Sequence, residues 1–131
     1  MKFESVLAVV IDDMVASRAL LIELLRKMNV SNVREADSGE RGLNLIRELV
    51  KAGKPPTLIF LDLHMPGMNG MEVLKKLKAD PDTSGVPVIM VSAEEQSTTI
   101  LESIEEGAAN YIVKPLTEQL LSEKLSRLIG S

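Results

Sequence analysis

Short runs of apolar residues alternate with longer amphipathic segments along the whole chain. Each run is only a few residues long and is bounded by charged residues or turn formers. Continuous apolar runs of this length predict strands that are buried on both faces of a sheet. The predicted strands are Val6–Ile11, Val33–Ala36, Leu58–Leu61, Val88–Val91 and Tyr111–Val113.

The segments between these runs carry apolar residues three and four positions apart, which is the spacing of one helix face. The apolar face of the fourth segment consists of Ile100, Leu101 and Ile104. The predicted helices are Val15–Met28, Glu40–Lys51, Met71–Lys78, Thr98–Glu106 and a final helix carrying Leu121, Leu125 and Leu128. Residues typical of helix ends support them: the expected N-caps are Ser38 and Thr117, and the expected C′ glycines are Gly53 and Gly107.

Five strand–helix pairs with short connections predict a parallel sheet with right-handed crossovers and helices on both faces. No linker, internal repeat or low-complexity stretch interrupts the pattern. A chain of 131 residues also has the common size of one domain. The sequence therefore predicts a single doubly wound α/β domain over residues 1–131.

Composition narrows the class of function. The formal net charge is −4, and aromatic residues make up 2% of the chain. The acidic charge argues against binding to a nucleic-acid backbone, and the scarcity of aromatic rings argues against a base-stacking surface. The absence of cysteine excludes disulfides and thiolate metal sites and fits a cytoplasmic protein. No apolar run is long enough to cross a membrane.

Polar side chains suited to chemistry follow four of the predicted strands. Asp12 and Asp13 follow the first strand, Asp62 the third, Ser92 the fourth and Lys114 the fifth. Open α/β sheets bind ligands at the carboxyl ends of their strands. Three carboxylates that meet there raise each other's pKa by repulsion, and a bound divalent cation removes that conflict. Oxygen ligands in a small, partly hydrated site favour Mg²⁺.

Together these residues form motifs that resemble the receiver domain of two-component response regulators. The motifs are Asp12-Asp13, Asp62-Leu-His-Met-Pro-Gly-Met-Asn-Gly70, Val91-Ser92-Ala93-Glu94 and Tyr111-Ile-Val-Lys114-Pro115. They follow one another in the family's order over essentially the whole chain, which is similar to the single-domain chemotaxis-type regulators. The resemblance implies a flavodoxin-like fold with five helices and the strand order 2-1-3-4-5. It also implies a cis peptide bond between Lys114 and Pro115.

The resemblance implies a catalytic role for several side chains. Asp62 is the expected phosphoacceptor. Lys114 and Ser92 are expected to contact the phosphoryl group once it is bound. The expected Mg²⁺ ligands are Asp12, Asp13, Asp62 and the backbone carbonyl of His64.

Signalling is expected to follow from movement of Ser92 toward the phosphoryl group, with Tyr111 turning inward. These switch residues would alter the face formed by the fourth helix, the fifth strand and the fifth helix. His64 stands two positions after the phosphoacceptor, where side chains of the family lie near the attacking water. It is therefore expected to influence hydrolysis of the phosphoryl group.

Simpler structural roles stay open for some of these residues. The paired aspartates could cap the first helix, and Ser92 with Glu95 has the spacing of a capping box. Glu94 and Glu95 are expected to face solvent. Asp37 also follows a strand, but we interpret it as a turn or capping residue because the family's strand order places that strand at the sheet edge.

The favoured function is a phosphorylation-controlled signalling switch rather than an enzyme, although such a domain catalyses its own phosphoryl transfer and hydrolysis. Expected partners are a sensor histidine kinase or phosphotransfer protein and a downstream protein, which could be a motor component, a phosphatase or an output domain. Nucleic acid and membranes are not expected partners, and the protein is expected to be a monomer or a weak dimer.

Several alternatives stay open. The chain could be the receiver piece of a larger regulator with an output domain, or a pseudo-receiver that takes no phosphate. A Mg²⁺-dependent aspartyl phosphatase would need a second aspartate where His64 stands. Gln96 and Ser97 replace lysines usual in chemotaxis regulators. Acidic residues follow them in the fourth helix, which favours a partner with a different charge pattern: Glu102, Glu105 and Glu106.

Overall fold

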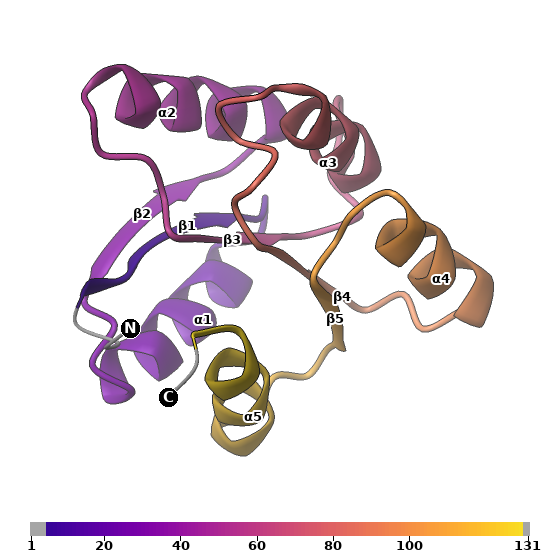
Figure 1. Cartoon of the computed structure of the whole chain (residues 1–131). Helices are drawn as coiled ribbons and strands as arrows, with labels where there is room; N and C mark the ends of the chain where they lie inside the picture. Colours follow the sequence, from indigo (N-terminus) through magenta and orange to yellow (C-terminus); the bar gives the residue numbers. More distant parts are fainter. Residues whose placement is uncertain (1–4, 130–131) are drawn as a thin grey trace.

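A computed structural model describes residues 5–129 of the chain. Within these residues, five parallel strands form one sheet in the order β2-β1-β3-β4-β5 (Figure 1). The strands are β1 (Leu7–Ile11), β2 (Asn32–Ala36), β3 (Leu58–Leu61), β4 (Val88–Ser92) and β5 (Asn110–Val113). Each lies within one residue of its predicted bounds, and the predicted fold class and strand order are confirmed. The ends of the predicted domain, residues 1–4 and 130–131, lie outside the described residues.

Five helices connect and follow these strands, and they cover both faces of the sheet. α1 and α5 lie on one face, and α2, α3 and α4 lie on the other (Figure 1). Their bounds are α1 (Val15–Lys27), α2 (Gly39–Lys51), α3 (Gly70–Ala79), α4 (Ser97–Glu105) and α5 (Glu118–Ile129). None of these helices is long and apolar enough to span a membrane within the described part of the chain.

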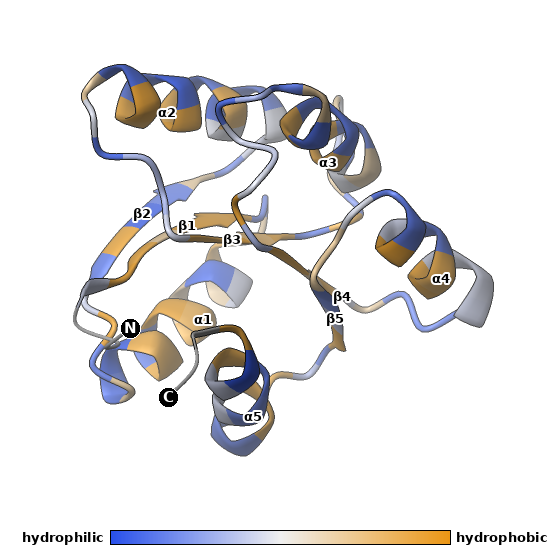
Figure 2. Ribbon diagram, viewed as in Figure 1, coloured by the Kyte–Doolittle hydropathy of each residue, from blue (hydrophilic) through white to orange (hydrophobic). Residues whose placement is uncertain are grey.

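The central strands are apolar (Figure 2). They separate two hydrophobic cores, and alternate strand residues belong to each. Phe60 of β3 belongs to the core beneath α1 and α5, whereas its neighbours Ile59 and Leu61 belong to the core beneath α2 and α3. All four residues of β3 are buried. This explains why the central strands appear in the sequence as continuous apolar runs.

The predicted helix ends are also found. The Ser38 hydroxyl accepts a hydrogen bond from the Arg41 N–H at 3.2 Å, and the Thr117 hydroxyl accepts one from the Leu120 N–H at 3.1 Å. Gly53 and Gly107 have φ angles of +75° and +110°, which favour glycine after a helix.

The prediction for the apolar face of α4 was wrong in part. Ile100 packs against the core, but Leu101 is 58% exposed and Ile104 is 42% exposed. The buried residue of α4 is instead Ser103, whose hydroxyl donates to the Ile100 carbonyl at 2.8 Å. Intrahelical hydrogen bonding lets this small polar side chain face the sheet, so the helix rotates its larger apolar residues toward solvent.

Candidate functional site

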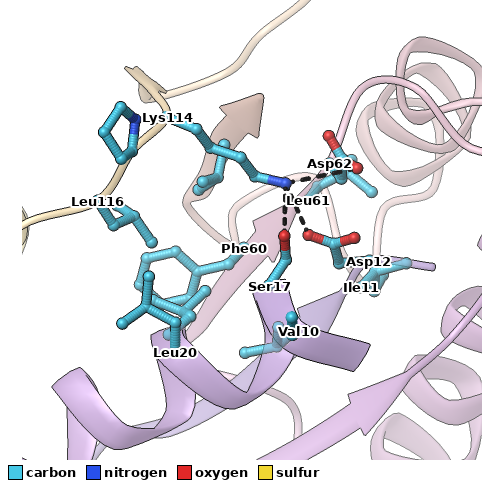
Figure 3. Close-up of a pocket in the computed structure, with 14 residues that line it drawn as sticks. Val10, Ile11, Asp12, Ser17, Leu20, Phe60, Leu61, Asp62, Lys114 and Leu116 are labelled. Atoms are coloured by element: carbon cyan, nitrogen blue, oxygen red, sulfur yellow. Dashed lines mark hydrogen bonds and ion pairs between the residues drawn. The ribbon is translucent and has the colours of Figure 1, made fainter. Parts of the chain in front are cut away.

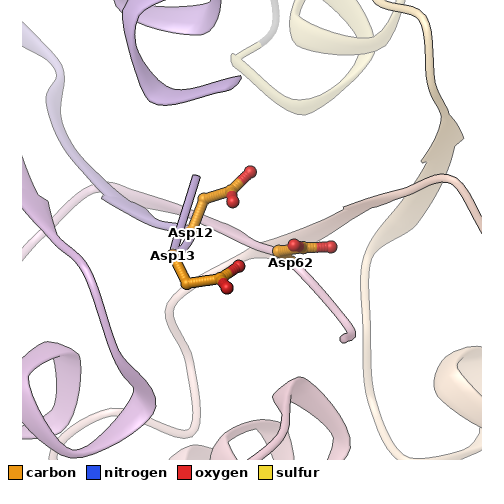
Figure 4. Close-up of side chains that lie close together, drawn as sticks. All are labelled: Asp12, Asp13 and Asp62. Atoms are coloured by element: carbon orange, nitrogen blue, oxygen red, sulfur yellow. The ribbon is translucent and has the colours of Figure 1, made fainter. Parts of the chain in front are cut away.

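The site is built at the carboxyl ends of β1 and β3. Ile11 and Leu61 are register partners in the two neighbouring strands, so the residues that follow them, Asp12 and Asp62, emerge side by side. Asp12, Asp13 and Asp62 each offer a carboxylate oxygen, and these oxygens all lie within 4.8 Å of one another (Figure 4). Asp12 and Asp62 are buried. The structure therefore brings the three predicted carboxylates together.

Lys114 reaches this cluster from the end of β5. Its ammonium nitrogen lies 3.0 Å from Asp12 Oδ2 and 3.8 Å from Asp62 Oδ2, and it donates to the Ser17 hydroxyl at 3.1 Å (Figure 3). The peptide bond from Lys114 to Pro115 is cis, as predicted. The lysine thus supplies a positive charge beside two carboxylates.

The ionisation of Asp62 reflects these neighbours. Burial and then the Asp12 carboxylate raise the pKa of Asp62 to about 6, although Lys114 and a backbone hydrogen bond from Leu63 lower it. The carboxyl is therefore largely ionised above that pH. Repulsion between adjacent buried carboxylates is the condition that a bound cation relieves.

The donor set is suited to a hard divalent cation. Three carboxylates offer oxygen ligands at close range, and the described residues include no thiolate or imidazole ligand in that cluster. No described residue donates a hydrogen bond to the His64 carbonyl, so it is free to be a further oxygen ligand. Oxygen ligands of this kind match Mg²⁺ or Ca²⁺ and not zinc.

α3 begins directly against the strand end that carries Asp62. The Gly70 N–H donates to the Leu63 carbonyl at 2.8 Å, and a methyl group at Gly70 would lie 2.8 Å from Leu63 Cα. Glycine is therefore required for this close approach. A capping box also fixes the start of α3: the side chains of Asn69 and Glu72 each accept a hydrogen bond from the other's backbone N–H.

Ser92 and Tyr111 lie beside this cluster, on β4 and β5. The Ser92 hydroxyl accepts a hydrogen bond from the Glu94 N–H at 3.2 Å and is buried. Tyr111 is also buried, and its hydroxyl donates to the Glu94 carbonyl at 2.7 Å. Burial raises the pKa of Tyr111, a hydrogen bond with Ser92 lowers it, and the charges of Glu94 and Asp62 raise it further. Tyr111 therefore connects β5 to the loop before α4.

The structure decides between the simpler roles considered above. α4 begins at Ser97 with Gln96 as its N-cap, so Ser92 does not form a capping box with Glu95. The N-cap of α1 is Met14, and neither preceding aspartate caps that helix, although Asp12 accepts the Met14 N–H at 2.9 Å. Their side chains are directed into the acidic cluster instead.

Two further predictions concerned surface acids. Asp37 is a turn residue at the edge strand and pairs with Arg41 at 3.1 Å, as interpreted. Glu95 is exposed, as predicted, whereas Glu94 is exposed only in part: its side chain is 26% exposed and lies 3.5 Å from Nε2 of His64. The imidazole of His64 is itself 67% exposed, so this contact lies at the rim of the site.

Two residues of the site were missed in the sequence. Ser17 holds the Lys114 ammonium, and Arg18 donates to the Asp12 carbonyl at 2.7 Å and to Glu35 at 2.8 Å. Ser17 precedes Leu21 by four positions, so it is a polar residue on the buried face of α1. That break in the apolar stripe was its only signal. Arg18 had none, because its partner Glu35 is distant in sequence.

A cavity of about 260 Å³ opens beside these charged groups (Figure 3). Apolar side chains from α1, β3 and the loop after β5 form most of its wall, among them Leu20, Phe60 and Leu116. Its polar end consists of Asp12, Asp62, Lys114 and Ser17. Asp62 can therefore be approached from this side.

Comparisons with known proteins agree with this geometry. The response regulator receiver domain family matches residues 8–126. Chemotaxis protein CheY-3 of Vibrio cholerae is 34% identical over 119 residues, which cover 91% of this chain and 88% of that protein. The receiver domain of the histidine kinase CKI1 from Arabidopsis thaliana, solved with Mg²⁺ and BeF3⁻, has a TM-score of 0.79 at 27% identity and is covered to 95%, against 99% of this chain. A chain in the CheX–CheY–BeF3–Mg²⁺ complex from Borrelia burgdorferi shares the fold, with a TM-score of 0.87 at 20% identity and 98% coverage of both chains.

A parallel 2-1-3-4-5 sheet with three aspartates and a lysine at its carboxyl edge defines the receiver class of α/β domains. The chain belongs to the response regulator receiver domain family. Within that family its relatives include chemotaxis regulators.

Proposed function

We propose that this protein is a phosphorylation-controlled signalling switch in which Asp62 accepts a phosphoryl group. The observation that carries this proposal is the position of Asp62 at the end of β3. It lies within reach of two further carboxylates, and its Oδ2 lies 3.8 Å from the Lys114 ammonium. A nucleophile in a receiver needs ionisation, positioning and neutralisation of charge. The end of β3 positions Asp62, Lys114 favours its ionised form, and the neighbouring carboxylates offer ligands for a cation that would neutralise charge.

In the proposed transfer, the P–N bond of a phosphohistidine breaks as a P–O bond to Asp62 forms, and the imidazole leaves. Asp62 is ionised above its pKa of about 6 and can attack. The Lys114 ammonium exchanges its contact with Asp62 for a phosphoryl oxygen while Asp12 and Ser17 keep it in place. The Ser92 hydroxyl donates a hydrogen bond to another phosphoryl oxygen.

Asp12, Asp13, Asp62 and the His64 carbonyl would hold Mg²⁺ in this site. When bound, the ion neutralises the charge that spreads over the phosphoryl oxygens in the transition state. The solved Arabidopsis receiver domain contains Mg²⁺ and BeF3⁻, which supports the choice of metal.

Readout would begin at Ser92. When its hydroxyl turns to the phosphoryl group, it releases the Glu94 N–H and changes the loop before α4. The Tyr111 hydroxyl holds the same loop through the Glu94 carbonyl, so β5 and α4 respond together. A local charge then biases an element with two arrangements, and the α4–β5–α5 face carries the signal.

We further propose that the protein acts by binding other proteins and does not turn over external substrates, apart from catalysing its own phosphoryl transfer and hydrolysis. A histidine kinase or phosphotransfer protein would supply the phosphoryl group. The phosphatase alternative is disfavoured because His64 occupies the position of the second aspartate, and its side chain points to the rim toward Glu94.

His64 stands two positions after Asp62 and lies 3.5 Å from Glu94 at the rim of the site, and we propose that this pair influences the rate of hydrolysis. His64→Ala is expected to change the dephosphorylation rate several-fold, measured as loss of the phosphorylated protein over time. Glu95→Ala is the matched control, because Glu95 is an exposed acid directly after Glu94. An unchanged rate for His64→Ala would exclude this role.

The function is tested by incubating the protein with Mg²⁺ and acetyl phosphate and measuring its intact mass. We expect a base-labile increase of about 80 Da, one phosphoryl unit. Asp62→Asn is expected to abolish the adduct, and omission of Mg²⁺ is expected to slow its formation strongly.

Asp37→Asn is the matched control, since Asp37 also follows a strand but lies at the sheet edge. This variant should form the adduct normally. Absence of any adduct on the unmodified protein would favour a pseudo-receiver and reject the proposal. Continuous phosphate release from many phosphate esters would favour the phosphatase.

A further inference from the structure

The outer surface of α4 combines exposed apolar and exposed acidic side chains. Leu101 and Ile104 are 58% and 42% exposed and lie three positions apart, so they share one helix face. Glu102 and Glu105, each next to one of these residues, are also exposed. We call these four residues the α4 surface. An exposed apolar pair with a charged border is typical of a protein-binding surface.

The acidic charge of this region is not balanced by nearby sequence. Between Lys78 and Lys114 the chain contains no lysine, arginine or histidine. The acidic residues of the same stretch are Asp80, Asp82, Glu94, Glu95, Glu102, Glu105 and Glu106. No described salt bridge involves a residue of the α4 surface. Lys78 lies beside Gly107 at the end of α4, but its ammonium donates to the Ser84 and Val86 carbonyls and not to a carboxylate of the α4 surface. These carboxylates are therefore available to a ligand of opposite charge.

From this arrangement we infer that the α4 surface binds a basic amphipathic protein segment. Apolar side chains of the segment would cover Leu101 and Ile104. Its lysine or arginine residues would lie against Glu102 and Glu105. Apolar contact then provides most of the affinity, and complementary charge provides selectivity and faster association.

A second copy of this chain fits the surface less well. In a symmetric dimer formed through this face, the same patch would meet itself. The acidic border of one copy would then lie near the acidic border of the other, and like charges placed together oppose association. A basic partner avoids this repulsion.

The surface is connected to the phosphorylation site. α4 follows the loop that contains Glu94, and the Glu94 carbonyl is held by Tyr111. Binding at α4 and phosphorylation of Asp62 would therefore change each other's equilibrium by the same factor. This inference rests on the proposed function, which assigns signalling to this face, and it adds the chemistry of the partner.

The test uses two synthetic peptides of about 15 residues, long enough for four helical turns. Both carry the same leucines on one helix face, and the other positions are lysine in one peptide and glutamate in the other. Each is titrated into ¹⁵N-labelled full-length protein, with and without Mg²⁺ and acetyl phosphate. We expect the lysine peptide to shift amide resonances of α4, and we expect its affinity to fall as salt is raised.

Variants locate the interaction. Glu102→Lys with Glu105→Lys is expected to weaken the lysine peptide by about tenfold and to favour the glutamate peptide. Leu101→Ser should weaken both. Glu48→Lys changes an exposed helical acid on α2 and should have little effect. Circular dichroism and the mass of the phosphoryl adduct show that each variant is folded and reactive.

Equal binding of the two peptides, or resonance shifts away from α4, would overturn the inference. Sedimentation of the unmodified protein as a dimer that Leu101→Asp separates would also overturn it, because a second copy would then cover the surface. If the phosphoryl adduct forms but the protein does not prefer the lysine peptide, this inference is rejected and the proposed function is not. Selective binding without any adduct rejects the proposed function and leaves the basic-segment site in place.

Discussion

α3 and α4 lie on the same face of the sheet, but they are held in opposite ways. α3 buries three large apolar side chains, begins with a capping box and packs its first residue against the strand end that carries Asp62. α4 fully buries a single serine, has no side-chain cap and exposes two of its three large apolar residues. Both helices follow strands that end at the site.

This difference in packing divides the site into two halves that hold different functional residues. The half formed by β1, β3 and α3 holds the carboxylates, and the proposed function requires these in fixed positions because a small displacement would change metal binding and attack. The half formed by β4, α4 and β5 holds Ser92 and Tyr111, which would have to move in the proposed signalling. Because α4 has few buried apolar contacts, its local rearrangement should cost little free energy. The comparison therefore predicts where substitutions are costly.

The largest expected effect comes from matched leucine substitutions. Leu74→Ala removes a fully buried side chain of α3 and is expected to lower the free energy of unfolding by about 2–5 kcal/mol. Leu101→Ala in α4 removes an exposed side chain and should change it by less than about 0.5 kcal/mol. Urea denaturation followed by circular dichroism measures both. Similar losses in the two helices would show that α4 is as firmly packed as α3.

The second prediction concerns the free-energy cost of ionising Asp62 in the half formed by β1, β3 and α3. The pKa of Asp62 is raised from 3.8 to about 6. Between these two pH values, Asp62 is therefore protonated in the folded protein and ionised in the unfolded chain. Stability therefore falls as pH rises through this window, and the full cost is present above it. Asp62→Asn removes that cost. It should stabilise the metal-free protein by up to about 3 kcal/mol at neutral pH, from about 1.4 kcal/mol per pKa unit.

Denaturation of both proteins with a chelator present, at pH values on either side of the window, checks this prediction. The gain from Asp62→Asn should be small near pH 4 and should reach its plateau above the pKa of about 6. Asp37→Asn, at an exposed ion pair, serves as the control and should show no such increase. A gain that does not depend on pH would mean that Asp62 is not held in a repulsive, desolvated position.

A smaller effect is expected at the helix starts. Asn69→Ala removes the side-chain oxygen that accepts the Glu72 N–H in the capping box of α3 and should cost about 1 kcal/mol. Gln96→Ala at the N-cap of α4 removes no side-chain cap hydrogen bond, so its effect should lie within about 0.5 kcal/mol. Thermal denaturation of both variants provides the measurement. A larger loss for Gln96→Ala would reverse the comparison.

The same two halves differ in how far the sequence could predict them. β3 and Asp62 were predictable because a strand buried on both faces leaves a continuous apolar run and then a polar residue. The exposed position of Leu101 was not, because helical spacing places Ile100, Leu101 and Ile104 on overlapping faces. Only packing shows that Ser103 takes the inner position. Ser17 was missed for a related reason, since its contact with Lys114 joins residues at opposite ends of the chain.

The last prediction tests whether α4 is released locally. Tyr111→Phe removes the hydroxyl that holds the Glu94 carbonyl and should cost about 1 kcal/mol. Because α4 has few other buried contacts, the loss should appear as faster amide hydrogen exchange in α4, with α3 unchanged. Thr83→Val is the matched control, since the Thr83 hydroxyl donates to the Leu77 carbonyl at 2.7 Å near the end of α3. Its loss should lower global stability and speed exchange throughout the protein, because α3 is part of the cooperative core. If Tyr111→Phe speeds amide hydrogen exchange in α3 as much as in α4, the two helices open together and α4 is not a separate switching element.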